Sequence, residues 1–114
     1  MADQHKERRK HPRYACDVGV QVRPEGGGGG YWGTLADISL GGCYVYSFSP
    51  LNLGTVLSLI LRTGDCEILV AGTVVTCHPG VGMGVEFIAF PTPDGESNLK
   101  AFIAHLEAEA IKDR

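Results

Sequence analysis

The sequence predicts a small domain dominated by β-structure, in which six antiparallel strands close into a barrel and a C-terminal α-helix follows. Six segments rich in β-branched and aromatic residues follow one another between residues 14 and 90, with turn residues between them. No helical segment separates them, so the crossovers of a parallel sheet are missing, and closing the sheet would hide its edges. After these segments the spacing of apolar residues changes to that of a helix.

The first strand is expected at residues 14–22, where apolar and polar side chains partly alternate. Pro24 and five consecutive glycines from Gly26 then leave no regular structure, which predicts a flexible loop between two antiparallel strands. The next two strands, residues 31–39 and 43–49, are rich in aromatic and β-branched side chains and flank a Leu-Gly-Gly turn signal. We expect these two strands to form a hairpin.

Three further strands are expected at residues 55–63, 66–78 and 81–90, each introduced by a turn that contains glycine. The helix is expected at about residues 97–112. Its apolar side chains recur at three- and four-residue intervals, at Leu99, Phe102, Ile103, Leu106 and Ala110. We expect this stripe to pack against the barrel, and a partner interface is the alternative.

Length and composition limit the classes of function. The chain has the length of one domain, and no apolar run approaches the roughly 20 residues that a membrane span requires. Its charged start lacks the apolar core of a secretory signal, so we expect a cytoplasmic protein. Because no nucleophile arrangement, metal cluster or phosphate loop is visible, we expect neither an enzyme nor a metal or cofactor.

The cysteines and the tryptophan are expected to be structural. In a reducing compartment, cysteines without metal-ligand spacing are expected to act as small buried hydrophobic residues. These are Cys16, Cys43, Cys66 and Cys77. Trp32 and the nearby tyrosines are expected in the core, because large aromatic side chains usually pack, and a place at the border of a site is the alternative.

Positive charge is concentrated at the start of the chain, although the formal net charge is −3. Residues 1–13 hold five lysines and arginines against two acidic residues, whereas residues 14–95 hold only Arg23 and Arg62 against seven acidic residues. We therefore predict a flexible basic arm over residues 1–13 and a barrel domain with its helix over residues 14–114. Such an arm can be a solvated terminus, a nonspecific patch for nucleic acid or membrane, or a dedicated anion clamp.

The hexapeptide DISLGG carries polar groups that a barrel does not require. Asp37 and Ser39 are two residues apart, so in an extended chain their side chains project from one face. Gly41 and Gly42 would bring bare backbone amides close to whatever that face binds. The alternative is turn chemistry, in which the aspartate and the serine bond to nearby backbone groups.

Arg9 and Arg13 favour the binding alternative. They lie four residues apart, and Pro12 between them directs the chain in extended form into the first strand. A guanidinium forks onto phosphate oxygens, pairs with the O6 and N7 edge of guanine and stacks on purines, whereas Asp37 is suited to accept from guanine N1 and N2. The pattern indicates a ligand that contains guanine and phosphate. A short basic arm on an acidic body does not suit DNA or RNA, which usually meet a broad positive face.

These two motifs together resemble those of the PilZ domain, a family that binds the bacterial second messenger cyclic di-GMP. RRKHPR contains the family's R-x-x-x-R pattern at Arg9 and Arg13. DISLGG contains its [D/N]-x-S-x-x-G pattern at Asp37, Ser39 and Gly42. The resemblance covers nearly the whole chain, from the arginine arm to the terminal helix, and implies a PilZ-like split barrel.

The resemblance implies a role for each motif residue. Arg9 and Arg13 would clamp guanine and phosphate. Asp37 and Ser39 would read a guanine edge, and Gly42 would permit close approach of the backbone. Arg8, just before the motif, would stack on or bridge to a second nucleotide, because an arginine there tends to favour an intercalated ligand dimer in this family.

The function implied is that of a single-domain bacterial receptor or adaptor for cyclic di-GMP. Binding would order the basic arm over the barrel, because a polyanionic nucleotide neutralises an arm that cannot bury enough surface to order alone. The changed surface would be offered to an unidentified downstream protein. The alternative is a PilZ-type protein-interaction module that works without a ligand.

Overall fold

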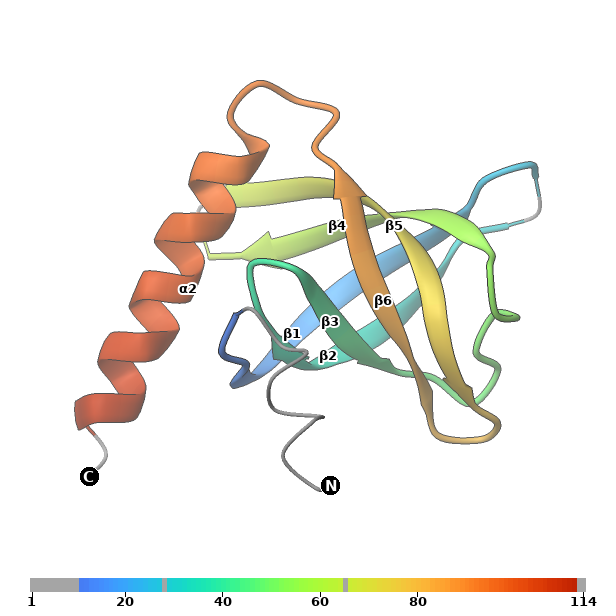
Figure 1. Ribbon diagram of the computed structural model, residues 1–114, viewed down its shortest axis with the longest axis horizontal. Coiled ribbons are helices and arrows are strands. Elements are labelled where there is room, and N and C mark those ends of the chain that lie inside the picture. Colours follow the sequence, from blue (N-terminus) through green and yellow to red (C-terminus); the bar gives the residue numbers. More distant parts are fainter. Residues whose placement is uncertain (1–10, 28, 65, 113–114) are drawn as a thin grey trace.

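The computed structural model describes residues 11–27, 29–64 and 66–112, and it has the predicted architecture of a barrel followed by a helix (Figure 1). The six strands are β1 (Tyr14–Pro24), β2 (Tyr31–Ile38), β3 (Gly42–Tyr46), β4 (Val56–Thr63), β5 (Cys66–His78) and β6 (Gly82–Ala89). Each strand pairs antiparallel with its neighbours, and the sheet closes in the order β1-β2-β3-β6-β5-β4. The helix, α2, spans Gly95–Lys112. The predicted hairpin of the second and third strands is confirmed.

Three element boundaries differ from those predicted by two residues or more. β1 continues to Pro24 because β4 runs alongside it that far, and a proline at the end of a strand costs little pairing. β3 ends at Tyr46, where its pairing with β2 stops, although the amide of Ser47 still donates to the carbonyl of Val81 beside β6 at 2.9 Å. α2 begins at Gly95, slightly before the predicted start.

The barrel interior is filled by apolar side chains from all six strands. Alternate residues of each strand point inward, as the pleat of a β-strand requires. Fully buried examples come from facing parts of the sheet, at Val20, Leu35, Val45, Leu59, Val70 and Met83. This continuous core holds the strand ends, and therefore the turns between them, in fixed positions.

α2 packs against the barrel along its length up to Glu107, and it contacts β1 and β5. Leu99 and Ile103 are buried in the core, and Phe102 and Leu106 are partly buried against it. Ala110 is exposed, so the apolar stripe is shorter than predicted. Figure 1 shows α2 leaning on one end of the barrel and extending past it. Among the described residues, no helix is long and apolar enough to cross a bilayer.

Three side chains expected in the interior lie at the surface instead. Trp32 is 58% exposed, because it occupies an outward position of β2, where its ring lies over Gly19 and beneath the guanidinium of Arg62, 5.3 Å from the ring centre. Of the nearby tyrosines, Tyr31 packs against the core as expected, whereas Tyr46 is 53% exposed. Cys66 is exposed because it opens β5 beside the tight connection from β4.

Candidate functional site

The pairing of β1 with β2 brings parts of both predicted motifs together. Ala15 of β1 lies opposite Asp37 near the end of β2. Arg13 directly precedes β1 and therefore stands beside Asp37, although 24 positions separate the two in sequence. Arg8 and Arg9 lie outside the described residues.

Arg13 and Asp37 form an ion pair in which guanidinium Nη1 donates to carboxylate Oδ1 at 2.9 Å. The side chains are 28% and 33% exposed, so the pair lies at the surface of the barrel and not in its core. The register of the sheet shifts on both sides of this position, between Ala15 and Val18 and between Leu35 and Asp37. Such irregularities bend a strand and redirect its side chains. A guanidinium carries five N–H donors, so a bond from one nitrogen to Asp37 leaves others to meet a ligand.

Ser39 organises the turn between β2 and β3. It is 4% exposed, and its Oγ accepts the amides of Gly41 and Gly42, both at 3.1 Å. Its own amide donates to the carbonyl of Gly42 at 2.8 Å. The expectation that Ser39 and Asp37 share an open face with two bare amides is therefore wrong. Serine takes the turn role that the sequence left as an alternative, and Asp37 pairs with an arginine.

The packing of the barrel itself requires Gly42. A Cβ at this position would lie 2.4 Å from the carbonyl oxygen of Val85 on β6, which is far inside contact distance. The carbonyl of Gly41 accepts the amide of Phe87 at 2.9 Å and so ties the turn to β6. A Cβ on Gly41 would lie 3.2 Å from Cδ2 of His11, so the chain before β1 covers this turn.

Burial disfavours ionisation of two thiols near the ion pair, those of Cys16 and Cys43. Burial, followed by the negative charges of Asp37 and Asp17, raises the pKa of Cys16 to about 11. Burial also raises the pKa of Cys43; Asp37 adds to this effect and Arg13 opposes it. Because the thiolate is the nucleophile and the metal ligand, both cysteines are structural here, as predicted.

A cavity of about 260 Å³ adjoins the turn, and residues from three separate segments line it. His11 comes from the chain before β1, Leu40 from the turn, and Lys100 and Glu107 from α2. The hydroxyl of Tyr14 donates to the Glu107 carboxylate at 3.0 Å and closes one side. Sequence reasoning missed this junction of arm, turn and helix, because 93 positions separate Tyr14 from Glu107 and no local pattern connects them.

Solved structures with this fold include the PilZ domain of YcgR from Escherichia coli with c-di-GMP. It shares 17% sequence identity at a TM-score of 0.76, over 93% of this chain and 96% of that chain. The MrkH–c-di-GMP complex of K. pneumonia shares 22% identity at a TM-score of 0.78, over 94% of this chain and 56% of that chain. The PilZ domain of CeSA, from a cellulose synthesizing bacterium, shares 20% identity at a TM-score of 0.68, over 84% of this chain and 98% of that chain. At these identities the likeness shows the fold.

The sequence also identifies a family directly. No curated protein sequence matches the chain significantly. The family model of the PilZ domain, however, matches residues 7–105, which include both arginine-motif positions, the turn after β2, all six strands and half of α2. The chain therefore belongs to the PilZ domain family.

Proposed function

We propose that this chain is a receptor domain for cyclic di-GMP that acts as an adaptor toward a partner protein. The observation that carries the proposal is the ion pair of Arg13 with Asp37, one residue from each family motif, held together by the pairing of β1 with β2. Membership in the PilZ family supports it, as do the similar folds solved with c-di-GMP.

The ion pair suits both parts of such a ligand. Arg13 offers its remaining donors to phosphate oxygens or to the O6 and N7 edge of guanine, and charge-assisted bonds of this kind are the stronger class. Asp37 offers the acceptor that guanine N1 and N2 need. Before a ligand binds, the guanidinium of Arg13 and the carboxylate of Asp37 neutralise each other, so neither charge is unpaired at the surface. Ser39 and Gly42 would contribute indirectly, because they stabilise the turn that follows Asp37 and so fix the position of its carboxylate.

Ordering of the basic arm supplies the signal in this proposal. Arg8 and Arg9 would join Arg13 around the nucleotide, because a polyanion offsets the mutual repulsion of closely spaced guanidiniums. Arg8 would favour two stacked nucleotides per protein. The arm leads into β1 through His11, which lies against Gly41 in the turn between β2 and β3. An ordered arm would therefore change the surface beside this turn and α2. A partner protein would read that change. Such a receptor acts in the cytoplasm, and its arm meets a nucleotide and not DNA or RNA.

Isothermal titration with cyclic di-GMP, with GTP and cyclic GMP as controls, tests the proposal. We expect selective binding, and we expect Arg13→Ala to weaken it at least about tenfold through loss of charge-assisted bonds. Arg23→Ala is the matched control, because Arg23 is an exposed arginine at the other end of β1. Equal binding by the wild type and Arg13→Ala would refute the role of the ion pair.

The same titration separates the remaining alternatives. Two nucleotides per chain would support the stacking role of Arg8, whereas one nucleotide would retain the receptor and reject that role. A folded protein that shows no selective binding would be a ligand-independent interaction module. Chromatography of the nucleotide after incubation should show no turnover, and a hydrolysed product would contradict our expectation that the protein is not an enzyme.

A further inference from the structure

Tyr44 of β3 lies directly opposite Asp37 of β2. Its neighbours in the strand, Cys43 and Val45, are buried in the core, so the side chain of Tyr44 projects from the outer face of the barrel. Paired residues of adjacent antiparallel strands present their side chains on the same face, with Cβ atoms about 5 Å apart. Asp37 therefore has Arg13 on one side, bonded at 2.9 Å, and Tyr44 on the other.

The ring of Tyr44 extends over β6 and is anchored there. A Cβ on Gly82 would lie 2.7 Å from Cε2 of the ring, so the ring occupies the space that a glycine leaves free. Gly84, the residue of β6 opposite Tyr44, is also a glycine. At the far end of the ring, the hydroxyl is hydrogen-bonded to Nδ1 of His78 on β5, at 2.8 Å. The backbone of one strand and the imidazole of another thus fix the orientation of the ring.

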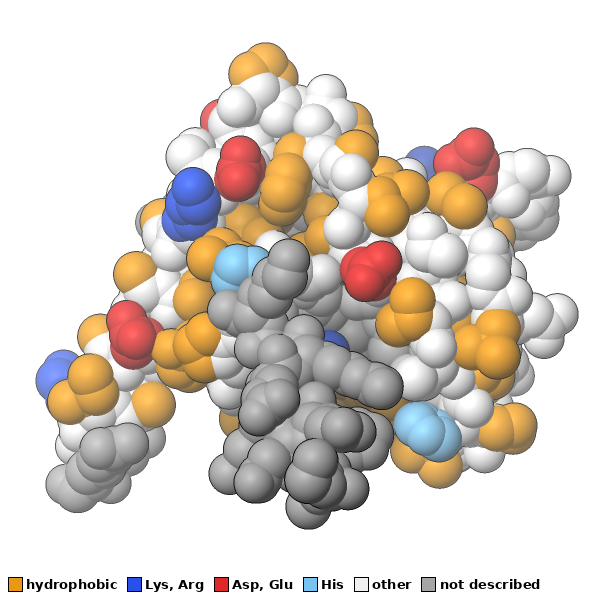
Figure 2. Space-filling model, viewed as in Figure 1, with side chains coloured by type: hydrophobic (Ala, Val, Ile, Leu, Met, Phe, Trp, Pro, Cys, Tyr) orange, Lys and Arg blue, Asp and Glu red, His pale blue; other side chains and the backbone are white. Residues whose placement is uncertain are grey.

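The anchored ring belongs to an aromatic surface. Figure 2 shows hydrophobic side chains, in orange, beside a histidine, in pale blue, at the end of the barrel where β5 turns into β6. The ring centres of Tyr44 and His78 are 5.8 Å apart, and Tyr46 meets Tyr44 edge-on at the same separation. Tyr44 is only half-buried, so part of its ring surface stays open to solvent. A surface ring with a fixed orientation and an open face is suited to stack on a planar ligand.

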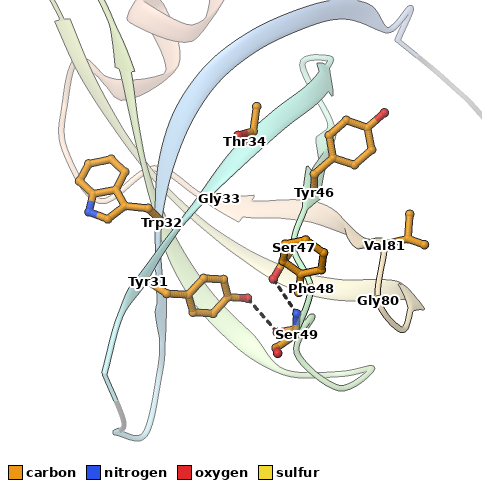
Figure 3. A pocket seen from close by; sticks show the side chains of 10 residues that line it. All are labelled: Tyr31, Trp32, Gly33, Thr34, Tyr46, Ser47, Phe48, Ser49, Gly80 and Val81. Carbon is orange, nitrogen blue, oxygen red and sulfur yellow. Dashed lines mark hydrogen bonds between the residues drawn. The ribbon is translucent and has the colours of Figure 1, made fainter.

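Tyr46 follows on the same face of β3, but its surroundings differ. It lies opposite Thr34, whereas Tyr44 lies opposite Asp37. Its ring lines a groove of about 770 Å³ at the start of β2, together with Phe48 (Figure 3). Of these two tyrosines, Tyr44 is the one that adjoins the ion pair.

A guanine base that met Asp37 through N1 and N2 would be confined by the neighbours of this carboxylate. Arg13 stands on the β1 side and bonds to Oδ1, so the base would extend over β3, where Tyr44 lies. The glycines at positions 82 and 84 place no side chain of β6 between such a base and the ring. Stacking on an aromatic ring would then add contact that hydrogen bonds to the base edge do not supply.

We propose that Tyr44 is a stacking platform for a guanine base held by Asp37, and that His78 is a positioning residue that fixes this platform. The inference rests on the proposed receptor function, and it adds a side chain from β3, outside both sequence motifs, to the nucleotide site. The edge contacts of Asp37 select guanine, whereas stacking on Tyr44 strengthens binding of any flat base.

Isothermal titration of the full chain with cyclic di-GMP tests the platform. Tyr44→Ala should weaken binding about tenfold or more, because it removes the stacked ring. Trp32→Ala is the control, because it removes a more exposed aromatic ring from an outward position of β2, and it should leave the affinity unchanged. Thermal unfolding of each variant verifies that the barrel is intact.

A double-mutant cycle tests the positioning role of His78. Tyr44→Phe keeps the ring but loses its bond to His78, and His78→Ala loses the same bond. Each change should weaken binding about two- to fivefold, and the two together should weaken it no further than either alone. Losses that multiply in the double variant would show that His78 does not act through Tyr44.

NMR spectroscopy of the wild type observes the stacking without a substitution. Upon saturation with cyclic di-GMP, the ring protons of Tyr44 should move upfield, because they would lie over the ring current of the base. Those of Tyr46 should shift much less.

Three results would overturn the platform and leave the receptor function in place. These are equal affinities of the wild type and Tyr44→Ala, equal losses in Tyr44→Ala and Trp32→Ala, and Tyr44 signals that the bound nucleotide does not move. A wild type that binds no cyclic di-GMP would overturn both proposals.

Discussion

At Gly42 a motif residue proves to be a packing requirement of the barrel. The backbone of β3 passes so close to β6 here that the position of a Cβ is occupied by the carbonyl oxygen of Val85. Ser39 likewise holds the turn by accepting two amides. Residues that the family motif associates with a ligand therefore also stabilise the protein without it.

Replacing Gly42 with alanine should destabilise the free protein by about 1–3 kcal/mol, because a methyl group forced against backbone must shift a strand. Urea unfolding without nucleotide measures the change in the free energy of unfolding. Gly29→Ala is the control, because a Cβ there meets nothing within 4 Å, and it should have little effect. Unchanged stability of Gly42→Ala would show that this glycine serves the ligand alone.

The exposure of Trp32 and Cys66 shows that residue type alone did not predict whether a side chain is buried. Residue type favoured the interior for both, and it was right for Cys43 and wrong for these two. Trp32 is outward because β2 places alternate residues on opposite faces and Tyr31 takes the inward position. Which of the two alternating sets of side chains on β2 faces inward depends on the register between β2 and β1. The sequence of β2 alone does not give this register.

Among the elements, α2 has a longer part that packs against the barrel, up to Glu107, and an exposed C-terminal end. Leu99 and Ile103 enter the core, and the bond from Tyr14 to Glu107 is the last attachment that the helix makes to β1. Beyond it, Ala110 and Ile111 face solvent. The spacing of apolar residues predicted the helix and the face that packs against the barrel. The last helix residue in contact with the barrel depends on the size of the barrel, which that spacing does not give.

Leu99→Ala should lower the free energy of unfolding by about 2–5 kcal/mol, because it leaves a cavity between α2 and the barrel. Ile111→Ala, at the exposed end of the same helix, should cost less than about 0.5 kcal/mol. Chemical unfolding followed by circular dichroism compares the two. Similar losses in both variants would contradict this division of the helix.

Most strands could be predicted because turn residues and side-chain alternation are local properties. β4 and β5 match their predicted ranges closely, whereas β3 is shorter than predicted because its pairing with β2 stops at Tyr46. A groove lined by residues that include Phe48 opens where β3 leaves β2. Because the predicted third strand was three residues too long at its end, the sequence analysis did not anticipate this groove.

At the scale of the whole molecule, the two ends of β2 carry different chemistry. One end holds a charged pair and a turn bound tightly to β6, and the other holds an uncharged aromatic groove. The buried core of the barrel lies between these two ends. Under the proposed function, nucleotide binding at the first end should stabilise the entire cooperative unit, because a ligand that binds only the folded state shifts the unfolding equilibrium.

Cyclic di-GMP should therefore raise the midpoint of thermal unfolding, with a gain of about 2.7 kcal/mol in stability at a nucleotide concentration one hundred times Kd. Differential scanning fluorimetry measures the shift. Arg13→Ala should lose most of it, whereas Arg23→Ala should keep it. An equal shift with GTP would indicate nonspecific binding of anions.

By itself the sequence determined the class of fold, the number and order of the strands, the terminal helix and the family, because strand alternation, helical spacing, turn residues and short motifs are encoded in neighbouring residues. It also predicted that Arg13 and Asp37 serve one ligand site. Only the tertiary structure decided that they pair directly, that Ser39 is buried in its turn, that Gly42 lies against Val85, and that Phe48 borders an open groove. These features arise from contacts between segments far apart in the chain, and such contacts depend on strand register and on where each strand leaves its neighbour.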